Sequence, residues 1–202
     1  CRQAMGRKPG GAICPPACCR RQADPWKSRK TKGVDGMAQL TEVTGRGREK
    51  ETAALASEIW HEYYRDLLGE KQIAYMLEKF QSEPALLQEE AEGYRIFWIL
   101  EEGKAEPAGY FMFRLNDPEG KLFLSKLYLR AESRGKGFSR LVFDFLKKEA
   151  AGHGLHTIWL TVNKGNATLG LYEHYGLTVA NSTVTEIGNG YVMDDYIMEM
   201  PV

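Results

Sequence analysis

Cysteine is absent from residues 37–202 of this chain, because all four cysteines lie before them (Cys1, Cys14, Cys18 and Cys19). Residues 37–202 therefore offer no thiol for nucleophilic catalysis and cannot form a disulfide with one another. No apolar run reaches the roughly 20 residues that a membrane-spanning helix needs. Residues 1–36 also lack the apolar segment of a secretory signal. We therefore expect a cytoplasmic protein with no membrane partner.

Net charge is absent from the chain as a whole, since 27 Lys and Arg balance 27 Asp and Glu. The balance hides a split, because residues 1–36 carry a net charge of +7 and residues 37–202 carry −7. The first 36 residues also hold half of the prolines and show neither helical nor strand periodicity. This composition predicts a disordered basic tail over residues 1–36.

Three interpretations of the tail are open. Its basic charge suits nucleic acid or a membrane surface. Its cysteines suggest a metal site, although no second ligand pair follows at finger spacing. The third interpretation, which we favour, is upstream or non-native sequence, because the chain begins with Cys and Met37 precedes the first strand-like segment. We therefore expect no metal and no nucleic-acid partner, and one functional domain over residues 37–202.

The spacing of apolar residues predicts the elements of that domain, which is long enough to bury its own core. Strands are predicted over 38–44, 94–100, 108–115, 121–130, 156–162, 177–187 and 191–200, and helices over 48–67, 70–81, 140–151 and 167–175. Residues 84–92 fit either a loop or a short helical turn. This order predicts an α/β fold in which a mixed sheet carries helices on both faces.

A glycine-rich turn, Arg134–Ser139 (RGKGFS), joins the predicted strand 121–130 to the predicted helix 140–151. Such a turn directs several backbone N–H groups to one place, with the positive end of a helix behind them. The turn therefore predicts a phosphate or pyrophosphate site, to which Arg134, Lys136 and Arg140 add positive charge. The alternative is a tight turn that only caps the helix.

Two motifs and the order of elements resemble the GNAT superfamily of acyl-CoA-dependent N-acetyltransferases over residues 37–202. The first motif is RxxGxS from Arg134, and the second is YxxxGL from Tyr172. The family prefers Gly or Ala where Ser139 stands, and Phe where the second motif ends in Leu. The second family motif also has an Asn at a fixed spacing before its Tyr, and neither Asn163 nor Asn166 lies at that spacing from Tyr172. Residues 188–196 (GNGYVMDDY) also resemble members of the diamine and polyamine type.

The resemblance implies an N-acetyltransferase that moves an acetyl group from acetyl-CoA directly to a primary amine. It also implies a mixed, mostly antiparallel sheet of about seven strands. The resemblance implies that Tyr172 is the general acid, and the alternative is that its ring only packs in the core. It also implies that the main chain of the fourth strand contacts the pantetheine amides. The implied cofactor-binding residues are Leu127, Leu129, Arg134, Gly135, Lys136, Gly137, Phe138, Ser139 and Asn166.

The acceptor and the general base are less well defined by the sequence. Ser125 and Lys126 stand where some relatives carry an acid, so we expect a base elsewhere or a water-mediated path. Asp194 and Asp195 alternate on a predicted strand, so at most one of them attracts a cationic amine into the acceptor groove.

The acidic charge of residues 37–202 favours a small cationic acceptor, and the resemblance suggests a homodimer. His61 and His174 are expected to pack or to face solvent, and Glu58, Glu62 and Glu89 are expected to be solvated. The competing function is a non-catalytic module of the same fold that senses acyl-CoA.

Overall fold

The computed structural model describes residues 31–32, 38–44 and 47–202. Apart from residues 31–32, the predicted basic tail and its cysteines lie outside the described residues, as does Met37. The helices are α1 (Arg48–Tyr63), α2 (Arg65–Leu68), α3 (Glu70–Phe80), α4 (Glu83–Ala91), α5 (Phe138–Gly152) and α6 (Leu169–His174), with a 3-10 turn η2 (Ala131–Ser133). Within these described ranges, each helix is too short or too polar to cross a lipid bilayer.

The strands form one sheet in the order β1-β2-β3-β4-β5-β6-β8-β7. Their bounds are β1 (Thr31–Lys32), β2 (Ala38–Glu42), β3 (Arg95–Glu101), β4 (Pro107–Leu115), β5 (Lys121–Leu129), β6 (Thr157–Asn163), β7 (Thr178–Gly188) and β8 (Tyr191–Pro201). All neighbours are antiparallel except β5 and β6, which are parallel. Seven strands of five or more residues and the two-residue β1 confirm the predicted mixed, mostly antiparallel sheet.

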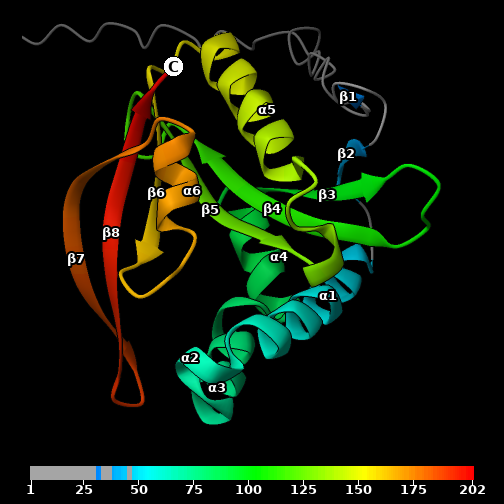
Figure 1. Ribbon diagram of the computed structural model, residues 1–202, viewed down its shortest axis with the longest axis vertical. Coiled ribbons are helices and arrows are strands. Elements are labelled where there is room, and N and C mark those ends of the chain that lie inside the picture. Colours follow the sequence, from blue (N-terminus) through cyan, green and yellow to red (C-terminus); the bar gives the residue numbers. More distant parts are fainter. Residues whose placement is uncertain (1–30, 33–37, 45–46) are drawn as a thin grey trace, which may run out of the picture.

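Helices cover both faces of the sheet, as Figure 1 shows. Alternate residues of the central strands explain this arrangement. Phe97 of β3 and Phe111 of β4 pack with α5 in the larger core cluster. Trp98 of β3 and Tyr110 of β4 point to the other face and pack with α1 and α4. The predicted α/β class with helices on both faces is confirmed.

Two helical predictions are refined by the structure. The predicted helix 48–67 is two helices, because α1 ends before Tyr64 and α2 begins at Arg65. The ambiguous segment 84–92 is helix α4, which has clear start signals. The hydroxyl of Ser82 accepts a hydrogen bond from the N–H of Ala85 at 3.4 Å, and Pro84 lies in the first turn.

A β-bulge in β5 determines which of its residues reach the interior. β4 pairs with Leu124 and next with Lys126, so Ser125 is the extra residue of the bulge. The bulge reverses the alternation, so Leu127 packs on the same cluster as Leu124, while Tyr128 packs against the α1 side. The side chain of Lys126 also lies on the face of the sheet opposite α5. Its buried ammonium donates to both carboxylate oxygens of Glu89 on α4, at 2.5 and 2.6 Å.

The expectation that Glu89 is solvated is therefore wrong. Burial lowers the pKa of Lys126, and the negative charge of Glu89 opposes that effect. The two charges depend on each other, because an ammonium without a partner is costly in the protein interior.

Removing this partner is expected to destabilise the fold. Glu89→Ala leaves the buried ammonium of Lys126 unpaired, so the free energy of unfolding should fall by about 3 kcal/mol. Urea denaturation followed by circular dichroism measures the change. Glu78→Ala is the control, because Glu78 is an exposed helical carboxylate, and its loss should stay within about 0.5 kcal/mol. Equal stability of the two variants would mean that the pair has no net structural role.

Candidate active site

A large cavity opens where β5 and β6 separate. The two strands pair only from Lys121 to Leu124 and from Thr157 to Leu160. Beyond these residues β6 continues along β8, while β5 stays with β4. The resulting cavity has a volume of about 930 Å³ and is lined by residues of α1, α2, α3, β5, the loop before α5, α5, β6, the loop before α6, α6 and β8. Beyond Leu124, one backbone edge of β5 has no strand partner among the described residues, and that edge faces the cavity.

The loop before α5 presents free backbone donors to this cavity. Gly135 and Gly137 have φ angles of +75° and +80°, the left-handed region that glycine adopts without strain. Gly137 is the N-cap of α5, and no side chain in the described part of the chain caps the helix. None of the N–H groups from Gly135 to Arg140 donates to an acceptor in the part of the chain that the structure describes. Six consecutive donors at the positive end of a 15-residue helix form a receptor for an anion.

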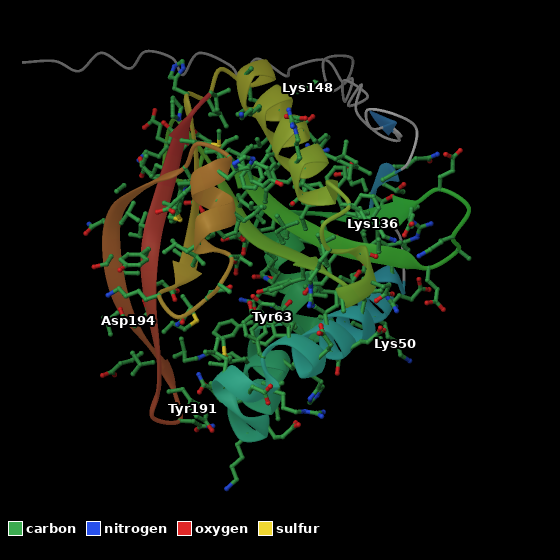
Figure 2. The ribbon with its side chains drawn as sticks, in the orientation of Figure 1. Lys50, Tyr63, Lys136, Lys148, Tyr191 and Asp194 are labelled. Atoms are coloured by element: carbon green, nitrogen blue, oxygen red, sulfur yellow. The ribbon has the colours of Figure 1, made fainter. Side chains whose placement is uncertain are left out.

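Most of the predicted site residues meet at the cavity. Those that line it are Leu127, Leu129, Arg134, Gly135, Gly137, Phe138, Ser139, Asn166 and Tyr172. Lys136 is not among the lining residues. Its ammonium donates to the carboxylate of Glu101 at 3.0 Å, beside the β3–β4 hairpin (Figure 2). The charge of Lys136 is therefore directed away from the free N–H groups of the loop.

Arg134 connects the loop to α1. Its guanidinium donates to both carboxylate oxygens of Glu62, one of them at 3.2 Å, and lies 4.8 Å from the ring centroid of Tyr63. Its Nε donates to the carbonyl of Leu129 at 3.2 Å. These contacts position the loop against α1, and they show that Glu62 is paired.

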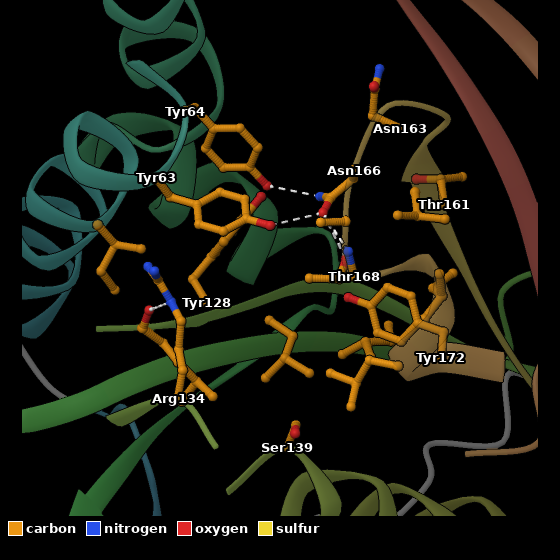
Figure 3. Close-up of a pocket in the computed structure, with 18 of the residues that line it drawn as sticks. Tyr63, Tyr64, Tyr128, Arg134, Ser139, Thr161, Asn163, Asn166, Thr168 and Tyr172 are labelled. Carbon is orange, nitrogen blue, oxygen red and sulfur yellow. Dashed lines mark hydrogen bonds between the residues drawn. The ribbon is translucent and has the colours of Figure 1, made fainter. Parts of the chain in front are cut away.

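Asn166 connects α1 to the loop between β6 and α6, as Figure 3 shows. Its amide oxygen accepts from the hydroxyl of Tyr63 at 3.1 Å and from both the N–H and the hydroxyl of Thr168 at 2.9 Å. Its amide nitrogen donates to the hydroxyl of Tyr64 at 3.4 Å. Only the second N–H of that amide is left for a cofactor, so the predicted contact of Asn166 with the cofactor depends on this one donor.

Tyr172 projects from α6 toward the cavity, with its hydroxyl near Thr168 (Figure 3). Its ring packs edge-on against Phe143 of α5, with the centroids 6.1 Å apart. Burial raises the pKa of Tyr172 to about 12, although a hydrogen bond with the Thr168 side chain lowers it. The phenol therefore keeps its proton at neutral pH and can donate it.

Several lining residues were not predicted from the sequence. Lys147 lines the cavity from α5, seven residues after Arg140 and so on the same side of the helix. That spacing could have identified Lys147. Trp60, Tyr64 and Tyr128 line the opposite wall. No motif marks these aromatic residues, because amphipathic periodicity alone assigns them to the core.

The candidate acids and bases lie in different places. His61 contacts Glu70 at 3.2 Å and does not line the cavity, whereas the exposed His174 does. Asp195 is buried and lines the cavity. Asp194 is exposed and pairs with Lys164 at 2.5 Å, at the periphery of the molecule (Figure 2). The two aspartates therefore lie on opposite faces of β8, as their alternation predicts.

Comparison with known proteins agrees with this architecture. The sequence profile of the acetyltransferase (GNAT) family matches residues 54–177, more than half of the chain. Among curated proteins, none matches this sequence.

Several solved structures share the fold. The PaiA N-acetyltransferase of Thermoplasma acidophilum, in complex with coenzyme A, is 18% identical with a TM-score of 0.62, over 82% of this chain and 99% of that chain. A GCN5-related N-acetyltransferase from Rhodopseudomonas palustris is 14% identical with a TM-score of 0.67, over 87% and 99%. The spermidine N-acetyltransferase of Vibrio cholerae, in complex with CoA and spermine, is 19% identical with a TM-score of 0.58, over 83% and 96%.

The family match extends from α1 through the glycine-rich loop, α5 and α6, and so includes most elements that line the cavity. The chain therefore belongs to the acetyltransferase (GNAT) family and is an acyl-CoA-dependent N-acetyltransferase with acetyl-CoA as its cosubstrate.

Proposed function

We propose that this enzyme transfers the acetyl group of acetyl-CoA directly to a primary amine of a small, cationic acceptor. The observation that carries the proposal is the row of six free N–H groups from Gly135 to Arg140, because all of these residues except Lys136 line the cavity between β5 and β6. These donors fit a pyrophosphate, and Arg140 and Lys147 add positive charge to the same wall. The backbone edge of β5 at Leu127 and Leu129 faces the cavity and suits the two amides of a pantetheine arm, although the carbonyl of Leu129 already accepts a hydrogen bond from Arg134.

One side chain of the cavity, Tyr172, has a proposed role in the transfer of the acetyl group. When bound, acetyl-CoA supplies an acetyl group activated as a thioester. An acceptor ammonium loses two protons on its way to the amide, as its nitrogen gains the bond to the acetyl carbon and the carbon–sulfur bond breaks. The sulfur takes up one proton from the phenol of Tyr172, which is the proposed donor, and one of the two amine protons replaces it on the phenolate. The other proton leaves through the cavity to solvent.

A small, cationic acceptor is supported by two observations. Residues 37–202 carry a net charge of −7, which attracts cations toward the domain. The cavity is also lined by the aromatic rings of Trp60, Tyr64 and Tyr128, whose faces attract ammonium groups. The similar enzyme from Vibrio cholerae acetylates spermidine, a cation of this class.

Release of free CoA thiol, measured across a panel of amines, tests the proposal. We expect turnover with aliphatic diamines, polyamines or amino sugars that exceeds the rate without an amine. The panel should also contain acidic amino acids and peptides with free N-termini. Turnover confined to those acceptors, or no turnover above the amine-free rate, would contradict the proposed function.

A further inference from the structure

The charged side chains of the cavity are divided between its two walls. Arg134, Arg140 and Lys147 belong to the loop and to α5, beside the free N–H groups. Asp144 lies among them on α5, between Arg140 and Lys147. The opposite wall is formed by α1, α2, β6 and β8. Among the described residues that line it, Asp195 is the one with a charged side chain. The cavity is therefore basic where phosphates fit and acidic on the side of β8.

Asp195 is a buried carboxylate that has no cationic partner among the described residues. Its residue is 5% exposed, and it lies opposite Asn163 in the pairing of β6 with β8. No Lys, Arg or His nitrogen of the described chain lies within 4.0 Å of its carboxylate oxygens, whereas Lys164 pairs with the neighbouring Asp194. Burial and the charge of Asp194 raise the pKa of Asp195, while the Asn163 side chain and the charge of Lys164 lower it. A buried carboxylate in a cavity is stabilised when a cationic ligand binds beside it.

Aromatic rings extend from α1 to the same part of β8. The ring centroid of Trp60 lies 4.7 Å from that of Tyr64 and 5.6 Å from that of Tyr128. Met193, two residues from Asp195 and so on the same face of β8, packs against this cluster. Burial raises the pKa of Tyr64 and of Tyr128, so both phenols are neutral at physiological pH. Neutral aromatic faces near one carboxylate form a chamber suited to an alkylammonium ion.

We propose that Asp195 binds an ammonium group of the acceptor and so selects aliphatic amines, which are cationic, over arylamines, which are neutral. This inference rests on the proposed function and adds to it the residue that determines the acceptor class. The ion pair forms in a partly desolvated chamber, where a charge pair contributes more to affinity than at an exposed site.

Asp195→Asn and Asp194→Asn make a matched pair of variants, because both keep the size of the side chain and the two residues are neighbours on opposite faces of β8. For an aliphatic diamine, Asp195→Asn should lower kcat/KM by about 30-fold or more, mainly through KM. For an arylamine, kcat/KM should change by less than about 3-fold, because a neutral arylamine forms no ion pair with Asp195 in the wild type. Asp194→Asn should leave both values and the affinity for coenzyme A within about 2-fold.

Thermal unfolding of the coenzyme A-loaded protein provides a second readout. The diamine should raise the melting temperature of the wild type and of Asp194→Asn, and should not raise that of Asp195→Asn. If Asp195→Asn has the same kcat/KM for the diamine as the wild type, or if its kcat/KM falls equally for diamine and arylamine, the inference is wrong and the proposed function stands. If the wild type binds no coenzyme A, or releases no thiol with any amine, the proposed function fails and the inference fails with it.

Discussion

Replacing Tyr172 by Phe is expected to lower kcat by about 100-fold or more while affinity for coenzyme A stays within about 2-fold of the wild type. The substitution removes only the hydroxyl, so the contact of the ring with Phe143 is kept. The pKa of Tyr172 is raised to about 12 by burial, so its proton is present throughout the neutral and mildly alkaline range. A group that stays protonated over this range can donate to a departing thiolate.

Steady-state thiol release and calorimetric titration with coenzyme A measure the two quantities. Tyr94→Phe is the matched control, because Tyr94 is a half-buried tyrosine outside the cavity and burial raises its pKa as well. Its kcat should not change. Unaltered turnover in Tyr172→Phe would remove the general-acid role, and a parallel loss of affinity for coenzyme A would indicate a structural role. A non-catalytic sensor would show no amine-dependent turnover in the wild type.

Replacing Gly137 by Val is expected to weaken coenzyme A binding by about 10-fold or more. Gly137 has a φ angle of +80°, a conformation that costs a residue with a side chain about 1–2 kcal/mol and costs a β-branched residue more. We expect the backbone to rotate and relieve this strain, which would change the directions of the N–H groups of the loop. Six donors that no longer converge bind a pyrophosphate poorly.

Gly154→Val separates strain from binding. Gly154 has a φ angle of +69° just after α5 and does not line the cavity. Both variants should unfold at a lower temperature than the wild type, because both place valine in a left-handed conformation. Only Gly137→Val should lose affinity for coenzyme A. Equal affinity in the two variants would mean that the loop does not hold the cosubstrate.

The sequence identified the parts of this site that depend on local structure. Glycines after a strand and before a helix predict free N–H groups, whatever lies around them, and the loop from Gly135 has that geometry. Alternation along a strand likewise places Asp194 and Asp195 on opposite faces. Periods of two and 3.6 residues were sufficient to find the strands and the longer helices. Only one residue of α4 is buried, Leu86, which explains why its helical pattern is weak.

The remaining features depend on contacts between distant segments. No glycine or proline marks the bulge at Ser125, yet the bulge directs Lys126 toward Glu89 on α4. The hydrogen bond from Tyr63 to Asn166 joins residues 103 positions apart. Likewise, the contact of Lys136 with Glu101 depends on where the β3–β4 hairpin ends. Tertiary packing determines each of these three contacts, so no local pattern in a single sequence predicts them.

The central claim is that the backbone between β5 and α5 holds the pyrophosphate of coenzyme A. Isothermal titration of the wild-type protein with coenzyme A, repeated in the presence of inorganic pyrophosphate, tests this claim most directly. We predict saturable binding at one site per chain, weakened when pyrophosphate competes for the free N–H groups from Gly135 to Arg140. An absence of binding at concentrations up to about 1 mM, where even a weak complex of about −4 kcal/mol is half formed, would contradict the account.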